Sequence, residues 1–236
     1  EDMEAIDVPE HLLNYFDYGG TLTAFLLAVG LPRLICCEHE YQTDCLIKTS
    51  AKGNIVTWQS KVLFTVLYCF VVVFVIGTSS LIINCRLFDF KGALQPVEMC
   101  VYFSDSALPP MSNIAYCVLQ YLFLFLGALY FAGFALLIAA LTRRTALTIF
   151  LCGASYLVCV LYEYVGYMFS GIADYVLGFF YRFGFGGYLL QASYSWNSYE
   201  GAGEWSDVWK PILLVVTMIL LEFSGLWLIW RRKARK

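Results

Sequence analysis

The segment from Glu38 to Asp44 concentrates the side chains of this chain that are best suited to recognition. It offers the carboxylates of Glu38, Glu40 and Asp44, the ring of Tyr41 and the hydroxyl of Thr43. Carboxylates form strong charge-assisted hydrogen bonds with basic groups, so the segment is suited to docking a partner. A solvated polar connector is the alternative, and the residue types alone fit both.

Cysteines beside this segment raise the question of a metal. Cys36, Cys37, Cys45 and His39 carry thiol and imidazole groups, which are ligands of zinc. Their spacing is poor, because adjacent cysteines rarely reach one ion together and no second Cys-x-x-Cys pair follows. We therefore expect no metal site and no cofactor, and we interpret these cysteines as cytoplasmic thiols.

Three polar side chains interrupt otherwise apolar stretches. Glu222 lies near the middle of one, where a carboxylate in a membrane costs about 2.5 kcal/mol or more unless it is protonated, paired or wetted. It is therefore a functional candidate, and a protonated Glu222 hydrogen-bonded to a neighbouring helix is the alternative. Glu163 is shallower and is expected to extend to the outer interface. Gln120 is expected to hydrogen-bond across helices.

No catalytic constellation emerges from the chain. It contains no Gly-x-x-x-x-Gly-Lys-Ser/Thr phosphate loop, no Gly-x-Ser-x-Gly elbow and no His-Glu-x-x-His zinc helix. An intramembrane enzyme that uses Glu222 is the weakest interpretation, because this carboxylate has no companion acid, base or metal. We expect the chain not to be an enzyme.

The composition indicates that these residues lie in a membrane protein. The 236 residues are 60% hydrophobic and only 14% charged, whereas an ordinary soluble domain has about 25% charged residues. The stretches Val62 to Cys85 and Ser106 to Thr142 contain no Asp, Glu, Lys or Arg. Apolar runs of about 18 or more residues are candidates for membrane spans, and unbroken runs of this kind suit helices. The sequence therefore predicts an all-α, polytopic membrane protein in contact with lipid.

The pattern predicts a single transmembrane domain over residues 1–236, with five spans. They are expected at Leu12 to Ile35, Val62 to Asn84, Asn113 to Leu141, Ala146 to Phe169 and Pro211 to Trp230. The acidic N-terminus starts without Met and lacks the basic region of a signal peptide. Together with the odd number of spans, this favours a natural protein of six spans whose first span is missing here.

Charge decides how the apolar, aromatic stretch from Tyr175 to Tyr194 is interpreted. A full crossing would place the basic tail, Arg231 to Lys236, on the outside, against the positive-inside rule. An outer re-entrant hairpin within residues 171–205 instead keeps 11 of the 15 basic residues inside. We therefore predict this hairpin in a multi-pass protein of the plasma membrane, with the N-terminus outside and the C-terminus in the cytoplasm.

In this topology residues 36–61 form a cytoplasmic segment. Cys37, Tyr41 and Cys45 recur at i, i+4 and i+8, while Glu38 and Gln42 fall elsewhere on the helical wheel. This periodicity predicts an amphipathic helix at the membrane interface. Such a helix can present its polar face to a cytoplasmic partner.

Several motifs follow one another in a recognisable order. Glu-x-Glu-Tyr-x-Thr begins at Glu38, an apolar turn ends in Lys48-Thr49, and Trp58-x-x-Lys61 opens the next span. The long span that ends in the Leu141 to Ala146 turn, the outer re-entrant region and the basic tail come next. In this order, which covers most of the chain, the sequence resembles the permeases of type-two ABC exporters.

The resemblance implies that the segment is the family's coupling helix, which seats in a cleft of an ATP-binding subunit. By position, Glu38, Glu40, Tyr41, Thr43 and Asp44 would form the coupling surface. The resemblance also implies two separate ATP-binding subunits, a second permease copy or homologue, and export of a hydrophobic or amphipathic substrate.

In that interpretation Glu222, Gln120 and Glu163 are candidates for the translocation path. The alternative is a non-transporting membrane sensor or scaffold whose cytoplasmic segment recruits a partner. An ATPase that co-purifies with the chain would favour the exporter, and its absence would favour the scaffold. No nucleic acid partner is expected.

Overall fold

The computed structural model describes residues 19–41, 43, 53–88, 94, 96, 111–165, 168, 171, 176–178, 181, 184, 185, 189 and 205–234. The main helices in this part are α2 (Gly19–Gly30), α3 (Arg33–Glu40), α5 (Gly53–Phe88), α6 (Asn113–Thr142), α7 (Thr145–Val165) and α10 (Trp205–Ala234). No strand occurs among these residues, apart from an isolated bridge between Pro96 and Ser112. The prediction of an all-α fold is confirmed for this part of the chain.

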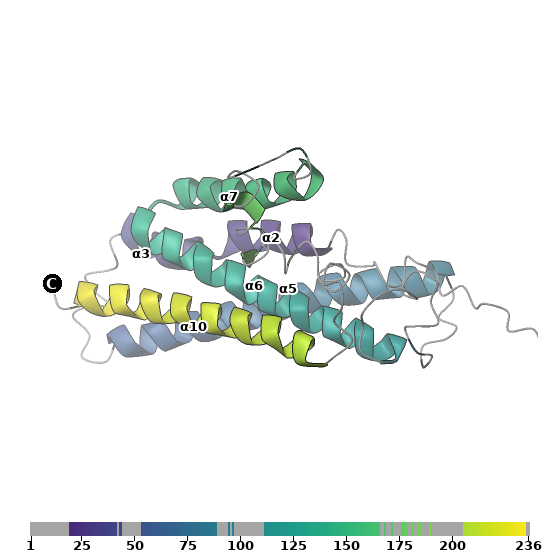
Figure 1. Cartoon of the computed structure of the whole chain (residues 1–236). Helices are drawn as coiled ribbons and strands as arrows, with labels where there is room; N and C mark the ends of the chain where they lie inside the picture. Colours follow the sequence, from purple (N-terminus) through teal and green to yellow (C-terminus); the bar gives the residue numbers. More distant parts are fainter. Residues whose placement is uncertain are drawn as a thin grey trace, which may run out of the picture.

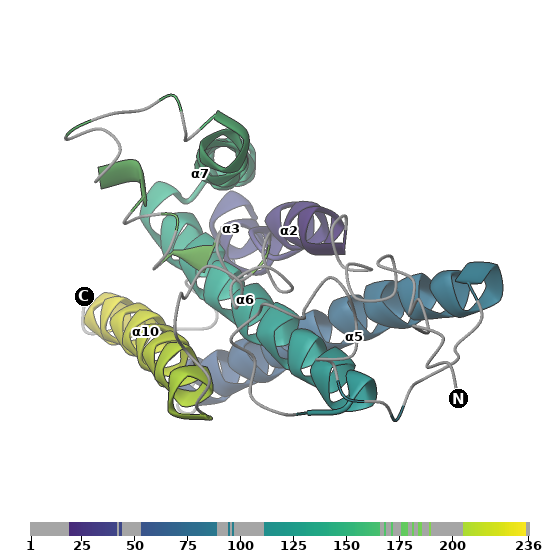
Figure 2. The same cartoon turned by 45° about the vertical axis from the view of Figure 1, so that its right-hand side comes forward.

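Helix α6 lies at the centre of the bundle. It packs against α2, α3, α5, α7 and α10, and Figure 2 shows it running diagonally between α10 and α7. Its stripe of Ala128, Ala132, Ala135 and Ala139 is fully buried, and such short side chains let other helices approach closely. The thiol of Cys69 on α5 reaches the Ala128 carbonyl at 3.8 Å. At this position, therefore, a helix of the same chain covers the stripe.

Five helical stretches are long and apolar enough to cross a membrane. They are Gly19–Glu38, Val56–Ile83, Asn113–Thr142, Thr145–Tyr162 and Ile212–Arg231. In Figure 1 the long helices run roughly lengthwise through the molecule, with α7 and α2 on one side of α6, α10 on the other, and α5 crossing α6. Large apolar side chains such as Phe70 and Phe74 on α5 and Leu213 and Leu220 on α10 are exposed. Lipid, rather than water, suits such surfaces, so the structure supports the predicted multi-pass membrane character.

The helix ends differ from the predicted span ends for physical reasons. Helix α5 begins at Gly53, before the predicted span at Val62, because its first turns continue the helix beyond its apolar part. Residues 53–61 of the predicted cytoplasmic segment therefore belong to α5. Pro32 separates α2 from α3, since proline lacks an N–H and disfavours helical backbone in the residue before it. Residues 12–18 and 44–52 lie outside the described part.

A tight turn joins α6 to α7, where the sequence predicts one. Arg143 has a left-handed φ of 56°, and its backbone N–H donates to the Ala139 carbonyl at 3.0 Å, which ends α6. Helix α7 then begins at Thr145. At the other end of α6, Ser112 is the N-cap, with its Oγ accepting from the backbone N–H of Ala115 at 3.4 Å.

Candidate functional site

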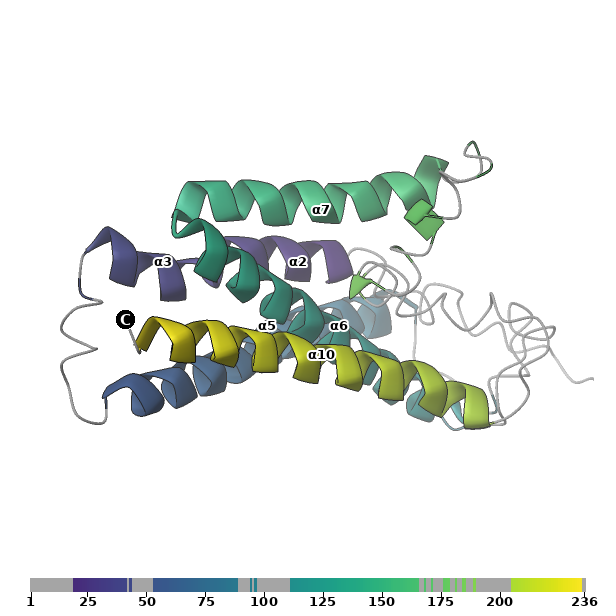
Figure 3. The same cartoon turned by 60° about the vertical axis from the view of Figure 1, so that its left-hand side comes forward.

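One end of the bundle brings together α3, the first turns of α5 and α7 and the last turns of α6 and α10. We call it the α3 end. Figure 3 shows α3, the beginning of α5 and the end of α10 at this end of the molecule. The side chains of Arg33, Arg143, Arg144 and Arg231 are exposed there. The α3 end is therefore basic on its surface.

An ion pair with an aromatic neighbour connects α3 to α5 and α10. The Lys61 ammonium lies 2.5 Å from a carboxylate oxygen of Glu38, and the two side chains are only 10% and 15% exposed. The same ammonium lies 4.3 Å from the ring centroid of Trp230 on α10, a cation–π geometry. The Trp230 ring is 6.3 Å from that of Trp58 on α5. Three elements that are distant in sequence are thus held at one charged group.

A second carboxylate connects α3 to α7. Oε1 of Glu40 accepts from the Thr145 hydroxyl at 2.8 Å and from the Thr145 backbone N–H at 3.2 Å. It therefore satisfies a donor at the start of α7, as an N-cap side chain would. The Thr145 hydroxyl, the Thr145 backbone N–H and, more weakly, the positive charge of Arg33 lower the pKa of Glu40 below its ordinary value.

The junction of α3, α6 and α7 is closed by a thiol and two hydroxyls. The Cys36 thiol lies 3.8 Å from the Thr148 hydroxyl and 3.9 Å from the Ala139 carbonyl. The hydroxyls of Thr148 and Thr142 are 2.7 Å apart, and either can donate. Cys36 is fully buried here, so it packs against α6 and α7 as a small side chain with a weak donor. The sequence alone does not indicate this role, because the partners of Cys36 lie more than 100 residues away.

The five predicted docking residues are therefore in different settings. Glu38 points into the bundle, and Thr43 donates to the Glu38 carbonyl from its backbone N–H at 3.0 Å and its hydroxyl at 3.4 Å. Glu40 is exposed but hydrogen-bonded to Thr145. Tyr41 is 73% exposed. Asp44 lies outside the described residues.

Two of the three predicted path residues, Glu222 and Gln120, lie apart. Glu222 on α10 lies against Gly133 of α6. Gln120 is fully buried and hydrogen-bonds with Tyr116, one turn away on the same helix. Because Gln120 and Gly133 are 13 residues apart on α6, they are separated by about 20 Å. The side chain of Glu163 lies outside the described part.

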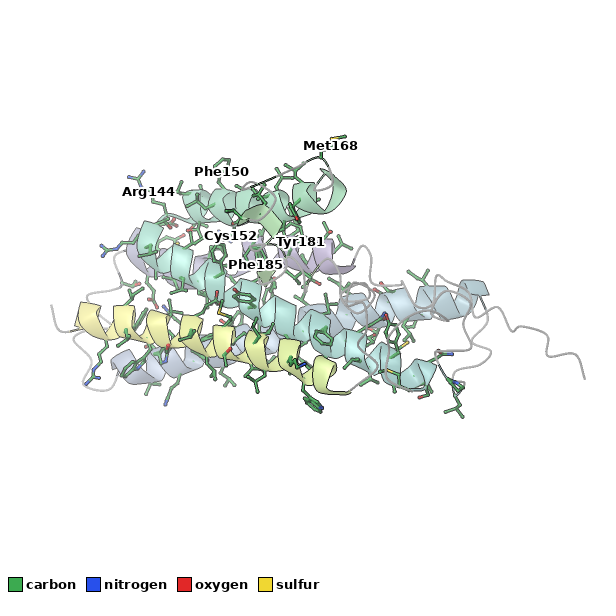
Figure 4. All side chains as sticks on the ribbon, viewed as in Figure 1. Arg144, Phe150, Cys152, Met168, Tyr181 and Phe185 are labelled. Atoms are coloured by element: carbon green, nitrogen blue, oxygen red, sulfur yellow. The ribbon has the colours of Figure 1, made fainter. Side chains whose placement is uncertain are left out.

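An aromatic cluster that the sequence pattern does not indicate lies beside the middle of α6. The ring centroid of Phe185 is 4.9 Å from that of Phe131, 5.2 Å from that of Phe134 and 6.1 Å from that of Tyr130. Figure 4 shows Phe185 and Tyr181 between α6 and α7, whereas Phe150 points away from the bundle. The periodicity of the sequence does not indicate that Phe185 lies inside the bundle.

No metal-binding group is present within the described residues, where no three His, Cys, Asp or Glu side chains lie together. Their cysteines Cys36, Cys37, Cys69, Cys117, Cys152 and Cys159 are free thiols. Comparisons of the chain with models of protein families, with curated proteins and with solved structures found no match.

Proposed function

We propose that this chain is the membrane-spanning permease subunit of an ATP-binding-cassette exporter. In this proposal separate subunits hydrolyse ATP, a second permease copy or homologue completes the path, and the substrate is hydrophobic or amphipathic. Support comes from the order of sequence motifs and from five helices apolar enough to cross a membrane. The observation that carries the proposal is the way α3 is attached to the bundle.

Helix α3 is linked to three other helices by its two glutamates. Glu38 pairs with Lys61 of α5, whose ammonium also lies over Trp230 of α10. Glu40 accepts two hydrogen bonds from Thr145 at the start of α7. A force applied to α3 would therefore act on α5, α7 and α10 at once, as a coupling element requires.

The surface of the α3 end is compatible with a cytoplasmic ATP-binding subunit. The exposed arginines of this end, Arg33, Arg143, Arg144 and Arg231, favour the cytoplasmic side of the plasma membrane. Tyr41 follows α3 directly, and its side chain is largely exposed. Exposed tyrosines are frequent anchors of protein interfaces, so Tyr41 is the residue of choice for contact with the ATPase.

The test is to purify the chain with an affinity tag from cells that express its natural neighbours and to measure bound ATPase. Tyr41→Ala is expected to lower the retained ATPase activity at least several-fold, because it removes an exposed interface anchor without touching the bundle. Phe150→Ala is the matched control, since Phe150 is 70% exposed on α7 in a segment that would face lipid. Glu38→Lys is unsuitable, because it would place two ammonium groups together.

Three outcomes decide between the candidates. ATPase retained by the native chain and lost from Tyr41→Ala supports the exporter. A bound partner without ATPase activity supports the membrane scaffold instead. ATPase that is retained equally by Tyr41→Ala and by the Phe150→Ala control would contradict the docking role of the α3 end.

A further inference from the structure

Glu222 is placed in a contact that leaves one of its carboxyl oxygens without polar neighbours. Its Oε2 has less than 1 Å² of exposed surface and no hydrogen-bond partner within the part of the chain that the structure describes. A methyl group on Gly133 would overlap this oxygen and would lie 3.2 Å from the Cβ of Glu222. The carboxyl group therefore occupies space on α6 that only a glycine leaves free.

The charged groups of the described residues that flank α6 and α10 lie far from this carboxyl. From α6, Tyr130 is the titratable side chain in electrostatic contact with it. On α10 itself, Lys210 and Arg231 are 12 and nine residues away, or about 18 and 14 Å along a helix. From α5, Lys61 meets α10 at Trp230, eight residues beyond Glu222. None of these cations is near enough to pair with the carboxyl group.

The site selects its occupant by size and by ligand number. Calcium and magnesium require at least six oxygen ligands, more than this contact offers. No space for an amine remains between Oε2 and Gly133, because even a methyl group on Gly133 would overlap this oxygen. A proton needs neither further ligands nor space, and it removes the charge that makes a carboxylate costly inside a membrane.

We propose that Glu222 is a proton-binding site between α6 and α10, occupied while the two helices are in contact and emptied when they separate. A ligand that binds one arrangement more tightly shifts the population toward it. Lower pH should therefore favour the α6–α10 contact, by at most about tenfold per pH unit for a single proton. This proposal does not depend on an exporter function.

Dicyclohexylcarbodiimide tests the proposal in the complete chain reconstituted in lipid, without other subunits. This reagent enters the lipid phase and reacts with protonated carboxyl groups. The carboxyl proton moves to one carbodiimide nitrogen and the carboxyl oxygen bonds to the central carbon. The adduct rearranges to a stable N-acylurea, so the peptide gains the whole mass of the reagent and nothing leaves.

At pH 7 the peptide that contains Glu222 is expected to carry the label, and Glu222→Gln is expected to reduce labelling at least tenfold. Gln matches the neutral carboxyl in size and charge, so this variant should fold. Glu40 is the internal control, because its hydrogen-bonded carboxylate should stay ionised and unlabelled. Label on the Glu222 peptide only at about pH 4 to 5, where ordinary carboxyls protonate, would overturn the proposal.

Infrared difference spectroscopy gives a readout that does not depend on access of the reagent. The spectrum of the native chain minus that of the Glu222→Gln variant should show the carbonyl stretch of a protonated carboxyl at pH 7. A carboxylate band in its place would show that the group is ionised and would overturn the proposal, whatever the labelling result.

Discussion

The α3 end and the middle of the bundle are held together by different physical means. At the α3 end, Glu38 and Glu40 each have a described polar partner on another helix. In the middle, Ala132 is fully buried within the stripe of α6. There an oxygen of Glu222 that has no polar partner among the described residues lies against Gly133. One region depends on charge and hydrogen bonds, and the other depends on volume.

This difference follows from access to water. A carboxylate near the surface can be ionised and hydrogen-bonded at little cost, so it can link elements without a close fit. Where water is excluded, packing volume determines which helices meet. Substitutions that change charge should therefore lower stability mainly at the α3 end. Substitutions that change side-chain size should lower stability mainly in the middle of the bundle.

The largest expected effect comes from overfilling the stripe. Ala132→Leu would place a branched side chain in a contact with no exposed surface and should cost about 3 kcal/mol of stability. The matched control is Val118→Leu on the same helix, where the side chain is 63% exposed and enlargement should change little. Thermal unfolding in detergent micelles measures both, and an unchanged midpoint for Ala132→Leu would refute the importance of volume here.

A smaller loss is expected when the ion pair at the α3 end is broken. Glu38→Gln leaves the mostly buried Lys61 ammonium without its counter-charge, at a cost of about 2 kcal/mol, below the 3–5 kcal/mol of fully buried pairs. Combining it with Lys61→Met removes the stranded charge and should recover part of the loss. A double-mutant cycle of unfolding free energies measures the coupling, and strict additivity would show that the pair contributes nothing.

The membrane helices could be predicted because lipid imposes a simple requirement on sequence. The third predicted span, Asn113 to Leu141, differs from α6 by one residue, since Ser112 caps the helix and the Arg143 turn ends it. The beginning of α5 could not be predicted in the same way. Hydropathy marks where a helix enters lipid, whereas residues 53–61 continue the helix outside its apolar part.

The candidate site was predicted only in part. Glu38 and Glu40 stand out as carboxylates, but their partners lie 23 and 105 residues away, and spacing in one sequence carries no information on such contacts. The burial of Phe185 was missed for the same reason. Glu222 was identified because a charge in an apolar run is costly wherever its neighbours lie.

A third prediction tests whether Glu222 and Gly133 share one space. Gly133→Ala alone should destabilise the chain by about 1 kcal/mol, since the carboxyl group is the far end of a side chain and can move. In a Glu222→Ala background the same substitution should cost less or should stabilise the helix. Equal costs of Gly133→Ala in both backgrounds, measured by thermal unfolding, would show that the two residues are not in contact.

The smallest expected effect concerns pH at the α3 end. Because the Thr145 hydroxyl and backbone N–H lower the pKa of Glu40 from its ordinary value of 4.5, its contribution to stability is fully present above that value. The contribution is lost as pH falls through the lower pKa of the folded state. Glu40→Gln should therefore flatten the acid side of a plot of melting temperature against pH. Thr145→Val keeps the backbone donor and should flatten the acid side less. If the native chain and both variants gave the same curve at acid pH, the contact of Glu40 with α7 would not hold α3 in place.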